Sequence, residues 1–427
     1  MSIISRCRRI GHAVLPASLT ATAAALLAAA VALTACARTP EDPLDDPRIA
    51  AVENSLVEVA SPAALFDTTT DGAASTAPET FTLAERMAHH NTPGVGIAVI
   101  EDGKLAWAKG YGVLGADGDT PVTAESIFQA GSTSKFVTAV LLLHYVEGGV
   151  FDLDTDVNEY LRSWRMPENE FTADRKVTLR LLLQHQAGLP TTDFDDVPPE
   201  EAPSVPEILV GRPVAGNEPA TPMRPLGDEW VYSNLGCIVV QLILEDTFGR
   251  PFEELAHEVI FEPLGMTSTT FSYPLPPEWA EREIMPHDGD GTQCLPLMNY
   301  TAFAHGGLMT TPTDLAKLHI ALMEWYGGKL GGVLSPEMTR AFLTPYFPIE
   351  PSPLGMPVSE GLGVFLRGEG DALAFFHPGG ATPGATSLPF ALPEVGKGAV
   401  VMTNGLNGWM VALEVLAAVM EEYDWPR

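Results

Sequence analysis

Segments with strand-like patterns lie toward both ends of this chain, and a long stretch with helical periodicity separates them. Toward the N-terminus, apolar runs over residues 94–100 and 105–112 flank Glu101-Asp102-Gly103-Lys104, where Asp-Gly favours the positive φ angles of a tight turn. Strand-like runs return after Gly361, over residues 363–367, 372–377, 385–392 and 399–403. Strands first, helices in the middle and strands last predict an α+β protein whose two ends share one antiparallel sheet, flanked by helices.

Capping signals and apolar periodicity predict the helices. Thr82, with Glu85 three residues later, is a capping box that opens a helix, and this helix has to end before Pro93. Further helices are predicted to begin at Ser132, Leu235, Thr311 and Trp409. Residues from about 150 to 325 then form a mainly helical lobe inserted into the sheet domain. The cleft between lobe and sheet is the expected site.

The first 35 residues have the pattern of an export signal. Three arginines (Arg6, Arg8 and Arg9) precede an apolar stretch that ends at Leu33-Thr34-Ala35-Cys36. This ending resembles the lipobox of bacterial lipoproteins, which implies removal of residues 1–35 and lipidation of Cys36. Ala37 after it favours the outer membrane in Gram-negative lipoproteins. The alternative is an uncleaved transmembrane anchor, because the apolar run approaches the roughly 20 residues that span a bilayer. In both cases the rest of the chain is exported and held at the periplasmic face of a membrane.

The stretch that follows the export signal has a different composition. Residues 36–80 are rich in Pro, Asp, Thr, Ser and Ala, and one amphipathic stretch at 49–59 interrupts them. We therefore predict a lipidated N-terminus and linker with a short helix. A single folded domain over residues 81–427 follows it.

The charge balance restricts the possible partners. Asp and Glu number 55 against 24 Lys and Arg, a formal charge of -31. Neutralising phosphates requires clustered Lys and Arg, so this balance argues against a nucleic-acid binder and favours a small molecule or another protein. The export signal contains three of the arginines and no acid, so 21 basic against 55 acidic residues, or -34, remain after its removal.

Two cysteines, Cys237 and Cys294, remain beside the predicted lipidation site and Cys7 of the signal. They either pair or stay reduced, and neither has a motif around it. A packed or paired thiol is the more frequent role for such residues than a nucleophile.

Ser132-Thr133-Ser134-Lys135 begins the helix after the hairpin. Residues three apart share a helix face, so Lys135 lies beside the Ser132 hydroxyl. A serine needs an adjacent base to act as a nucleophile, and a lysine among apolar groups can lose its proton near neutral pH. The helix N-terminus also favours developing negative charge.

Two further short motifs lie where the fold would bring them to the same cleft. Tyr232-Ser233-Asn234 precedes an apolar helix, and it supplies a phenol for proton transfer and an amide for a polar substrate group. His377-Pro378-Gly379-Gly380 ends a strand, and its glycines let the backbone approach a ligand and contribute an oxyanion-hole N–H. Taken singly, each is also compatible with a capped helix start or a tight turn.

Together, the three motifs resemble those of the serine β-lactamase and penicillin-recognising superfamily, in order and approximate spacing. The similarity is greatest to class C β-lactamases, the related DD-carboxypeptidases and family VIII carboxylesterases, and it covers residue 80 to the C-terminus. It extends to supporting segments at 94–99, 181–189, 262–266 and 306–308. The resemblance implies a β-lactamase/transpeptidase-like fold.

The resemblance also implies roles for individual residues. Ser132 would be the acylated nucleophile, Lys135 its proton-transfer partner and Tyr232 the general base that protonates the leaving group, although either Lys135 or Tyr232 could be the base. Asn234, His377 and Gly379 would bind substrate, and the backbone N–H groups of Ser132 and Gly380 would form the oxyanion hole. The implied reaction is two-step acyl transfer to water from an ester, a D-peptide or a β-lactam.

One position departs from the class C pattern. Those enzymes typically have lysine, which holds the β-lactam carboxylate, where this chain has His377. A histidine is mostly neutral at pH 7 and attracts an anion less strongly. The sequence therefore favours a carboxylesterase or D-amino-acid peptidase over a class C-like β-lactamase. A non-catalytic, penicillin-binding-like envelope module is the alternative from another functional class.

Other candidates have weaker support. His185 and His305 could line the cleft, but stabilising a loop is the more frequent role for such residues. Asp152, Asp154 and Asp156 resemble the start of a calcium loop that lacks its glycine, since Val157 stands there. We therefore expect neither a metal nor a cofactor.

Overall fold

The computed structural model describes residues 42–66, 79–192, 194, 201–211, 216–294, 301–381 and 384–426. The chain divides into two compact units, residues 1–46 and 47–427. In the first, the described residues form one 3₁₀ turn, η1 (Pro43–Asp45), capped by Asp42. The predicted signal peptide (residues 1–35) and Cys36 lie outside the described residues. No helix in the described ranges combines the length and apolar character that crossing a membrane requires.

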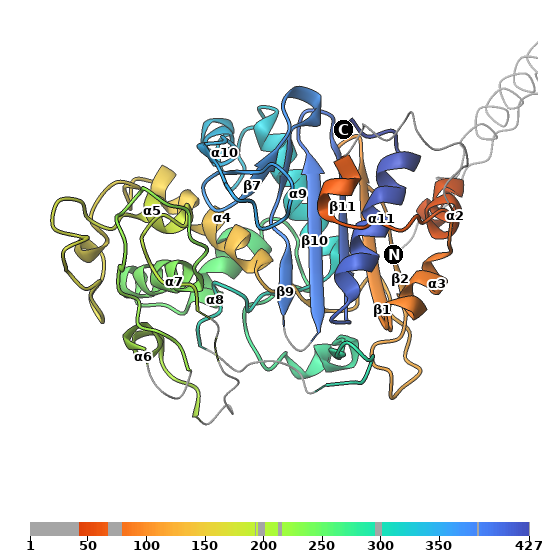
Figure 1. Cartoon of the computed structure of the whole chain (residues 1–427), viewed down its shortest axis with the longest axis horizontal. Helices are drawn as coiled ribbons and strands as arrows, with labels where there is room; N and C mark the ends of the chain where they lie inside the picture. Colours follow the sequence, from red (N-terminus) through yellow and green to blue (C-terminus); the bar gives the residue numbers. More distant parts are fainter. Residues whose placement is uncertain are drawn as a thin grey trace, which may run out of the picture. The chain divides into compact units, whose positions relative to one another are not determined.

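The second unit is built on an antiparallel sheet, to which the described residues contribute nine strands (Figure 1). The strand order is β2-β1-β11-β10-β8-β7-β6-β5, and β9 pairs with β10. The strands are β1 (Gly94–Glu101), β2 (Lys104–Gly112), β5 (Phe347–Pro348), β6 (Ser359–Glu360), β7 (Phe365–Arg367), β8 (Ala374–Phe376), β9 (Gly379–Ala381), β10 (Ala385–Leu392) and β11 (Lys397–Thr403). A separate two-stranded sheet joins β3 (Phe128–Gln129) to β4 (Met309–Thr310).

Strands from the beginning and the end of the second unit are neighbours in this sheet. Strand β1 pairs with β11 in a register that sets Val95 opposite Thr403. The turn between β1 and β2 uses positive φ angles at Asp102 (52°) and Gly103 (67°), as its Asp-Gly sequence predicts. The prediction that both chain ends share one antiparallel sheet is confirmed.

Helices cover both faces of the sheet (Figure 1). Alternate residues of β1 point to two different cores, with Val95, Ile97 and Val99 on one side and Ala98 and Ile100 on the other. The first core includes α2 (Pro47–Asn54), α3 (Leu83–His89) and α11 (Gly408–Glu422). The second includes α4 (Thr133–Glu147) and α9 (Pro312–Tyr326). Burial on both faces explains why these strands are continuous apolar runs.

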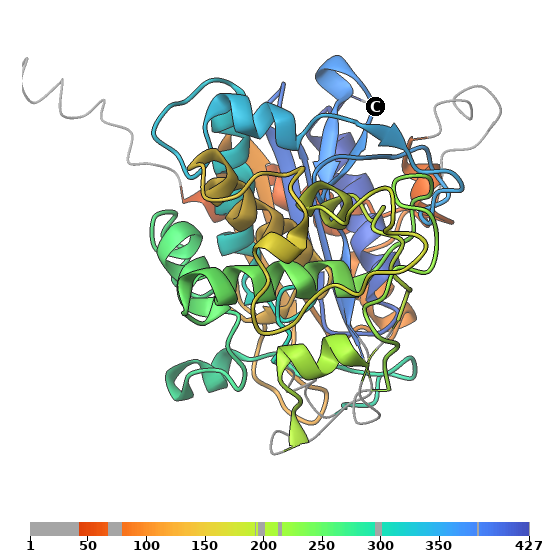
Figure 2. The same ribbon diagram turned by 90° about the vertical axis from the view of Figure 1, so that its left-hand side faces the viewer.

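The segment between α4 and α9 forms the helical lobe, which faces the viewer in Figure 2. Its α-helices are α5 (Leu179–Leu183), α6 (Val205–Val210), α7 (Asn234–Phe248) and α8 (Phe252–Ala256). Short turns add η4 (Val157–Glu159), the π-helical η6 (His257–Phe261) and η7 (Pro277–Arg282). After α9 come α10 (Pro336–Phe342) and η8 (Gly370–Ala372). The inserted helical lobe is therefore present, with long loops between short helices.

The compact unit begins at Pro47, upstream of the start at Phe81 that the sequence predicts. Helix α2 buries Ile49 and Val52 against the core under α11, and the 3₁₀ turn η2 (Pro62–Phe66) follows. On the outer side of α2, Glu53 accepts hydrogen bonds from Lys109 and from the Tyr111 hydroxyl. The few apolar residues in this Pro-rich and Asp-rich stretch gave no clear sequence signal for its packing. The observed helix, Pro47–Asn54, ends before the end of the amphipathic stretch at residue 59.

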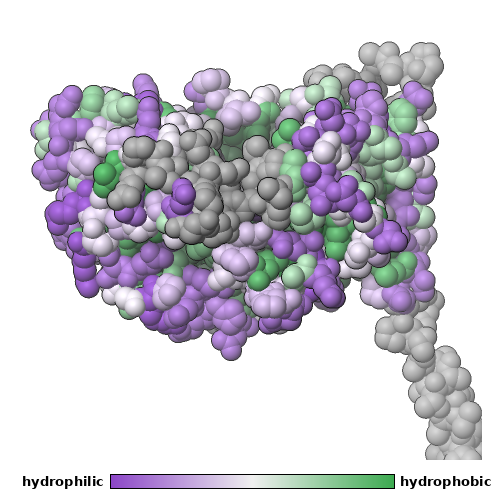
Figure 3. All heavy atoms as spheres, turned by 90° about the horizontal axis from the view of Figure 1, so that it is seen from below, coloured by the Kyte–Doolittle hydropathy of each residue, from purple (hydrophilic) through white to green (hydrophobic). Residues whose placement is uncertain are grey.

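Both remaining cysteines are free thiols in this structure. Cys237 is buried in α7, and burial raises its pKa to about 11. Cys294 is half-buried in the loop that precedes residue 295. Seen from below, the described surface is largely hydrophilic, with apolar residues in small separate groups (Figure 3).

Candidate active site

Ser132 lies at the N-terminal end of α4, in a turn fixed by its neighbours. Gly131 before it has a φ of +52°. The Ser134 hydroxyl donates to the Gly131 carbonyl (2.6 Å) and accepts from the Leu308 N–H (2.9 Å). These bonds attach the turn to the strand segment before β4 and hold Ser132 in place.

Lys135 lies one helical turn from Ser132 and faces it. Its side chain is buried with 1% exposure, and its amine donates to the Ser132 hydroxyl at 3.0 Å. A second bond runs from the amine to the His305 backbone carbonyl at 2.7 Å. Ser-x-x-Lys spacing on a helix therefore produces the predicted pair.

Tyr232, just before α7, lies next to Lys135. The Lys135 amine is 4.9 Å from the centre of the Tyr232 ring. The Thr191 hydroxyl donates to the Tyr232 carbonyl (2.7 Å), and the Val231 N–H donates to the His185 carbonyl (2.9 Å). The motif is thus held by the loop that follows α5.

Asn234 and Ser233 anchor the start of α7 to the same loop. The Asn234 amide donates to the Thr192 carbonyl at 3.0 Å. The Ser233 N–H donates to Nδ1 of His185 at 3.2 Å. These two bonds fix the motif to the loop that follows α5.

The third motif lies against the Ser132 turn because its glycines have no side chains. A Cβ on Gly379 would be 1.9 Å from the Ala130 carbonyl oxygen, and a Cβ on Gly131 would be 2.5 Å from the Gly380 oxygen. The Thr133 hydroxyl also donates to the His377 carbonyl at 2.9 Å. Strand β9 and the nucleophile turn are therefore in direct contact.

His377 is buried beside Tyr232. Its ring stacks on Phe365 (4.9 Å between centres), and it lies 6.3 Å from the Tyr232 ring. Nδ1 of His377 is 3.0 Å from the Pro378 carbonyl, and Nε2 has no hydrogen-bond partner among the described residues. The structure thus brings Ser132, Lys135, Tyr232 and the His377–Gly380 segment to one place.

Three histidines around Lys135 are held in the neutral form. Burial, followed by the Lys135 charge, lowers the pKa of His377 and of His305 to about 3. The same two causes bring the pKa of His185 well below its usual value. His377 therefore carries no positive charge at pH 7.

Two residues of this region were not identified from the sequence. The Trp230 ring lies 6.0 Å from Tyr232 and 5.8 Å from His185. Its indole N–H donates to Glu360 of β6 at 2.9 Å. Trp230 is two residues from Tyr232 in an extended segment, a spacing that places both side chains on one side and could have indicated the contact. Glu360 has no such signal, since it comes from a distant segment.

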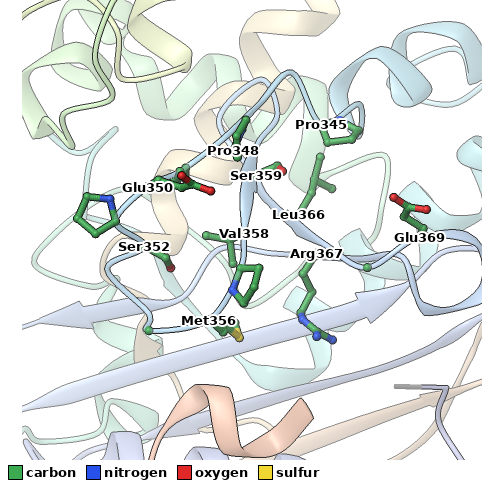
Figure 4. A pocket seen from close by; sticks show the side chains of 15 residues that line it. Pro345, Pro348, Glu350, Ser352, Met356, Val358, Ser359, Leu366, Arg367 and Glu369 are labelled. Atoms are coloured by element: carbon green, nitrogen blue, oxygen red, sulfur yellow. The ribbon is translucent and has the colours of Figure 1, made fainter. Parts of the chain in front are cut away.

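A pocket adjoins the third motif. The pocket of about 340 Å³ adjoins the Gly379–Gly380 backbone and is lined also by Leu406 and Trp409. A larger pocket, of about 620 Å³, lies along residues 345–369, apart from the predicted site residues (Figure 4). No group of His, Cys, Asp and Glu in the described part of the chain could hold a metal ion.

Sheet, helical lobe and the Ser–Lys–Tyr arrangement define a β-lactamase/transpeptidase-like fold, and comparison with known proteins agrees. The Beta-lactamase family model matches residues 82–419. The chain therefore belongs to the Beta-lactamase family, whose members are serine hydrolases.

Individual relatives are distant. The chain is 30% identical over 256 residues to an unguisins hydrolase of Aspergillus campestris, which is 57% of this chain and 46% of that protein. It is 28% identical over 247 residues to penicillin-binding protein 4 of Amycolatopsis lactamdurans, 54% of this chain and 60% of the other. The chain thus spans less than two thirds of the length of either relative.

Among solved structures, the octameric penicillin-binding protein homologue from Pyrococcus abyssi is similar. Its TM-score is 0.67 at 25% identity, covering 79% of this chain and 76% of the other.

Proposed function

We propose that this protein is an exported serine hydrolase that forms an acyl-enzyme on Ser132 and cleaves an ester or a peptide-like amide. The observation that carries the proposal is the 3.0 Å bond from the buried Lys135 amine to the Ser132 hydroxyl. Such a pair supplies the adjacent base that a serine nucleophile needs.

In the proposed mechanism, Ser132 attacks the substrate carbonyl while its proton passes to the Lys135–Tyr232 pair. Tyr232 then returns a proton to the leaving group, and water hydrolyses the acyl-enzyme by the reverse route. The Ser132 and Gly380 N–H groups form the oxyanion hole, which is supported by the contact between Gly131 and Gly380. Asn234, His377 and Gly379 contact substrate.

The surroundings of the oxyanion hole favour an uncharged substrate group. Neutral His377 offers no cation, and the pocket beside Gly380 has no charged side chain among its described lining residues, which include Thr386, Leu406 and Trp409. A carboxylate placed in this pocket would lose hydration without a counter-ion from those residues. We therefore favour a neutral ester over a class C-like β-lactam, and we keep a D-peptide as a candidate substrate because the His377-Pro378-Gly379 segment resembles that of related peptidases.

The place of action is also part of the proposal. The Leu-Thr-Ala-Cys ending at Cys36 supports a lipid anchor at the periplasmic face of a bacterial membrane. Because Ala37 follows Cys36 in place of an acidic residue, we propose that this membrane is the outer membrane. Mass spectrometry of protein extracted from cells checks this, since an acylated N-terminal Cys36 is expected. A mature chain without lipid would contradict it.

The catalytic part is tested by the variant Ser132→Ala. It should lose turnover of a p-nitrophenyl ester by about 10³-fold or more, together with labelling by a fluorescent penicillin, because no other group can form the acyl bond. The control Ser163→Ala changes an exposed serine outside the site and should behave as wild type. Equal activity in Ser132→Ala and wild type would refute the proposal. A short-chain ester, a D-Ala-D-Ala peptide and a cephalosporin, assayed side by side, distinguish the substrate classes.

A further inference from the structure

Glu360 is a buried acid that the proposed mechanism does not use. It is the last residue of β6, and its exposed fraction is 1%. Within the described ranges no Lys, Arg or His forms an ion pair with it. A carboxyl group without a cation is costly to bury, so the contacts that hold it indicate what it does.

The Glu360 carboxyl lies between the Trp230 indole and the turn that joins β6 to β7. The indole donates to Oε2 at 2.9 Å. Burial raises the pKa of Glu360 well above its usual value, and the indole, followed by the backbone of Gly363 and Val364, partly offsets this rise. The indole is the one side chain that it contacts by a hydrogen bond in the described part of the chain.

Trp230 links Glu360 to Tyr232, because its ring packs near the Tyr232 ring. Its ring lies 6.0 Å from Tyr232, 5.8 Å from His185 and 6.2 Å from Phe365, measured between ring centres. The Tyr232 ring also packs on His185 at 4.6 Å, with the Lys135 amine 4.9 Å from its centre. Ring packing of this kind sets where the phenol hydroxyl lies, and a rotation of the indole would move it.

We propose that Glu360 is a positioning residue, which orients Trp230 so that Tyr232 stays beside Lys135 and Ser132. The proposal rests on the proposed function, because it assigns Tyr232 a part in proton transfer. Glu360 touches neither Ser132 nor Lys135 by any described hydrogen bond. Its effect on the reaction therefore passes through the indole.

Glu360→Gln tests the proposal with little change in volume. Glutamine keeps one acceptor oxygen and replaces the other by an NH₂ donor, which weakens the bond from the indole N–H or, where the NH₂ faces the indole, breaks it. Trp230→Phe removes the same bond from the other side and keeps an aromatic ring. The matched control is Glu369→Gln, an exposed carboxyl on the pocket of Figure 4.

Two measurements read the outcome. The first is NMR of protein with ring-labelled tyrosine, in which the signal missing from Tyr232→Phe identifies Tyr232. Both Glu360→Gln and Trp230→Phe should shift this signal, and Glu369→Gln should leave it in place. The rate of Ser132 labelling by a fluorophosphonate should fall about tenfold in each, because small displacements of a proton-transfer group reduce rates strongly. The combined variant should be no slower than either single one.

The proposal is overturned if Glu360→Gln leaves the Tyr232 signal unmoved. It is also overturned if the two rate losses multiply, since Glu360 would then act independently of Trp230. If the wild type shows no labelling while the Tyr232 signal still shifts, the proposed hydrolase function fails and the positioning role stands. If Glu360→Gln does not fold, Glu360→Asp takes its place, since the shorter side chain withdraws the carboxyl from the indole N–H, and Glu369→Asp is then its control.

Discussion

Gly379 and Gly380 are adjacent residues with opposite steric environments. A Cβ on Gly379 would lie 1.9 Å from the Ala130 carbonyl oxygen, whereas the nearest atom to a Cβ on Gly380 would be the Ala385 oxygen at 4.0 Å. Neither residue has a positive φ, so alanine suits both backbone conformations. The difference lies entirely in the space between β9 and the nucleophile turn.

We therefore predict that Gly379→Ala lowers the free energy of unfolding by about 1–3 kcal/mol, because β9 has to move off the Ser132 turn. Gly380→Ala should leave it unchanged or raise it by about 0.5 kcal/mol through loss of chain entropy in the unfolded state. Urea unfolding of the two variants measures both values. Equal stability of the two variants would contradict the close contact.

At the residue scale, the sequence predicts the Ser132–Lys135 pair because helix geometry alone brings residues three apart together. It also predicts that glycine is needed near His377. The Glu360–Trp230 contact could not be predicted, because it joins segments 130 residues apart. The neutral state of His377 depends on burial, which the sequence pattern does not define.

Helices α3 and α11 are joined by a buried ion pair. The Arg86 guanidinium donates to both carboxyl oxygens of Glu414, at 2.8 and 2.6 Å, and Glu414 is fully buried. The hydrogen bond to Glu414 is the main cause that raises the pKa of Arg86. This ion pair therefore holds α3 against α11.

Glu414→Ala should reduce the free energy of unfolding by about 3–5 kcal/mol, since it leaves the Arg86 charge buried and unpaired. The exposed pair Arg250–Glu254, whose members are four residues apart, provides a comparison. Glu254→Ala should change stability by less than about 1 kcal/mol. Chemical denaturation distinguishes the two, and a small loss in Glu414→Ala would show that the pair is not essential to the packing.

The sequence predicts the ends of helices where the capping residues are close together in the chain. The capping box of Thr82 and Glu85 forms as predicted, and Thr311 caps α9. By contrast, α2 belongs to the folded unit through contacts of Ile49, Val52 and Glu53 with distant strands and α11. Such long-range packing has no signature within a short polar stretch.

Across the whole molecule, buried histidines make folding sensitive to acid. Burial lowers the pKa of His319 to about 4, and its ring is stacked between Phe136 and Phe375, away from the Ser132 pair. In the unfolded chain this histidine binds a proton below about pH 6.5, whereas in the folded protein it does so only near pH 4. Stability is therefore lost as the pH falls through this window.

His319→Leu should remove this contribution. Between pH 6.5 and pH 5, wild type should lose about 1.6 kcal/mol more unfolding free energy than the variant, since one bound proton corresponds to about 1.4 kcal/mol per pH unit and binding is half complete at pH 6.5. Urea unfolding at several pH values measures the difference. Identical pH dependence in the two proteins would show that His319 takes up no proton on unfolding.

The proposed hydrolase activity depends on acylation of Ser132. Intact-protein mass spectrometry within seconds of mixing with a p-nitrophenyl ester, followed by peptide mapping, measures this. We predict that the mass rises by one acyl group, that the group is on the peptide containing Ser132, and that it disappears on further incubation. An unmodified protein during ester turnover, or an acyl group on another residue, would contradict the proposed mechanism.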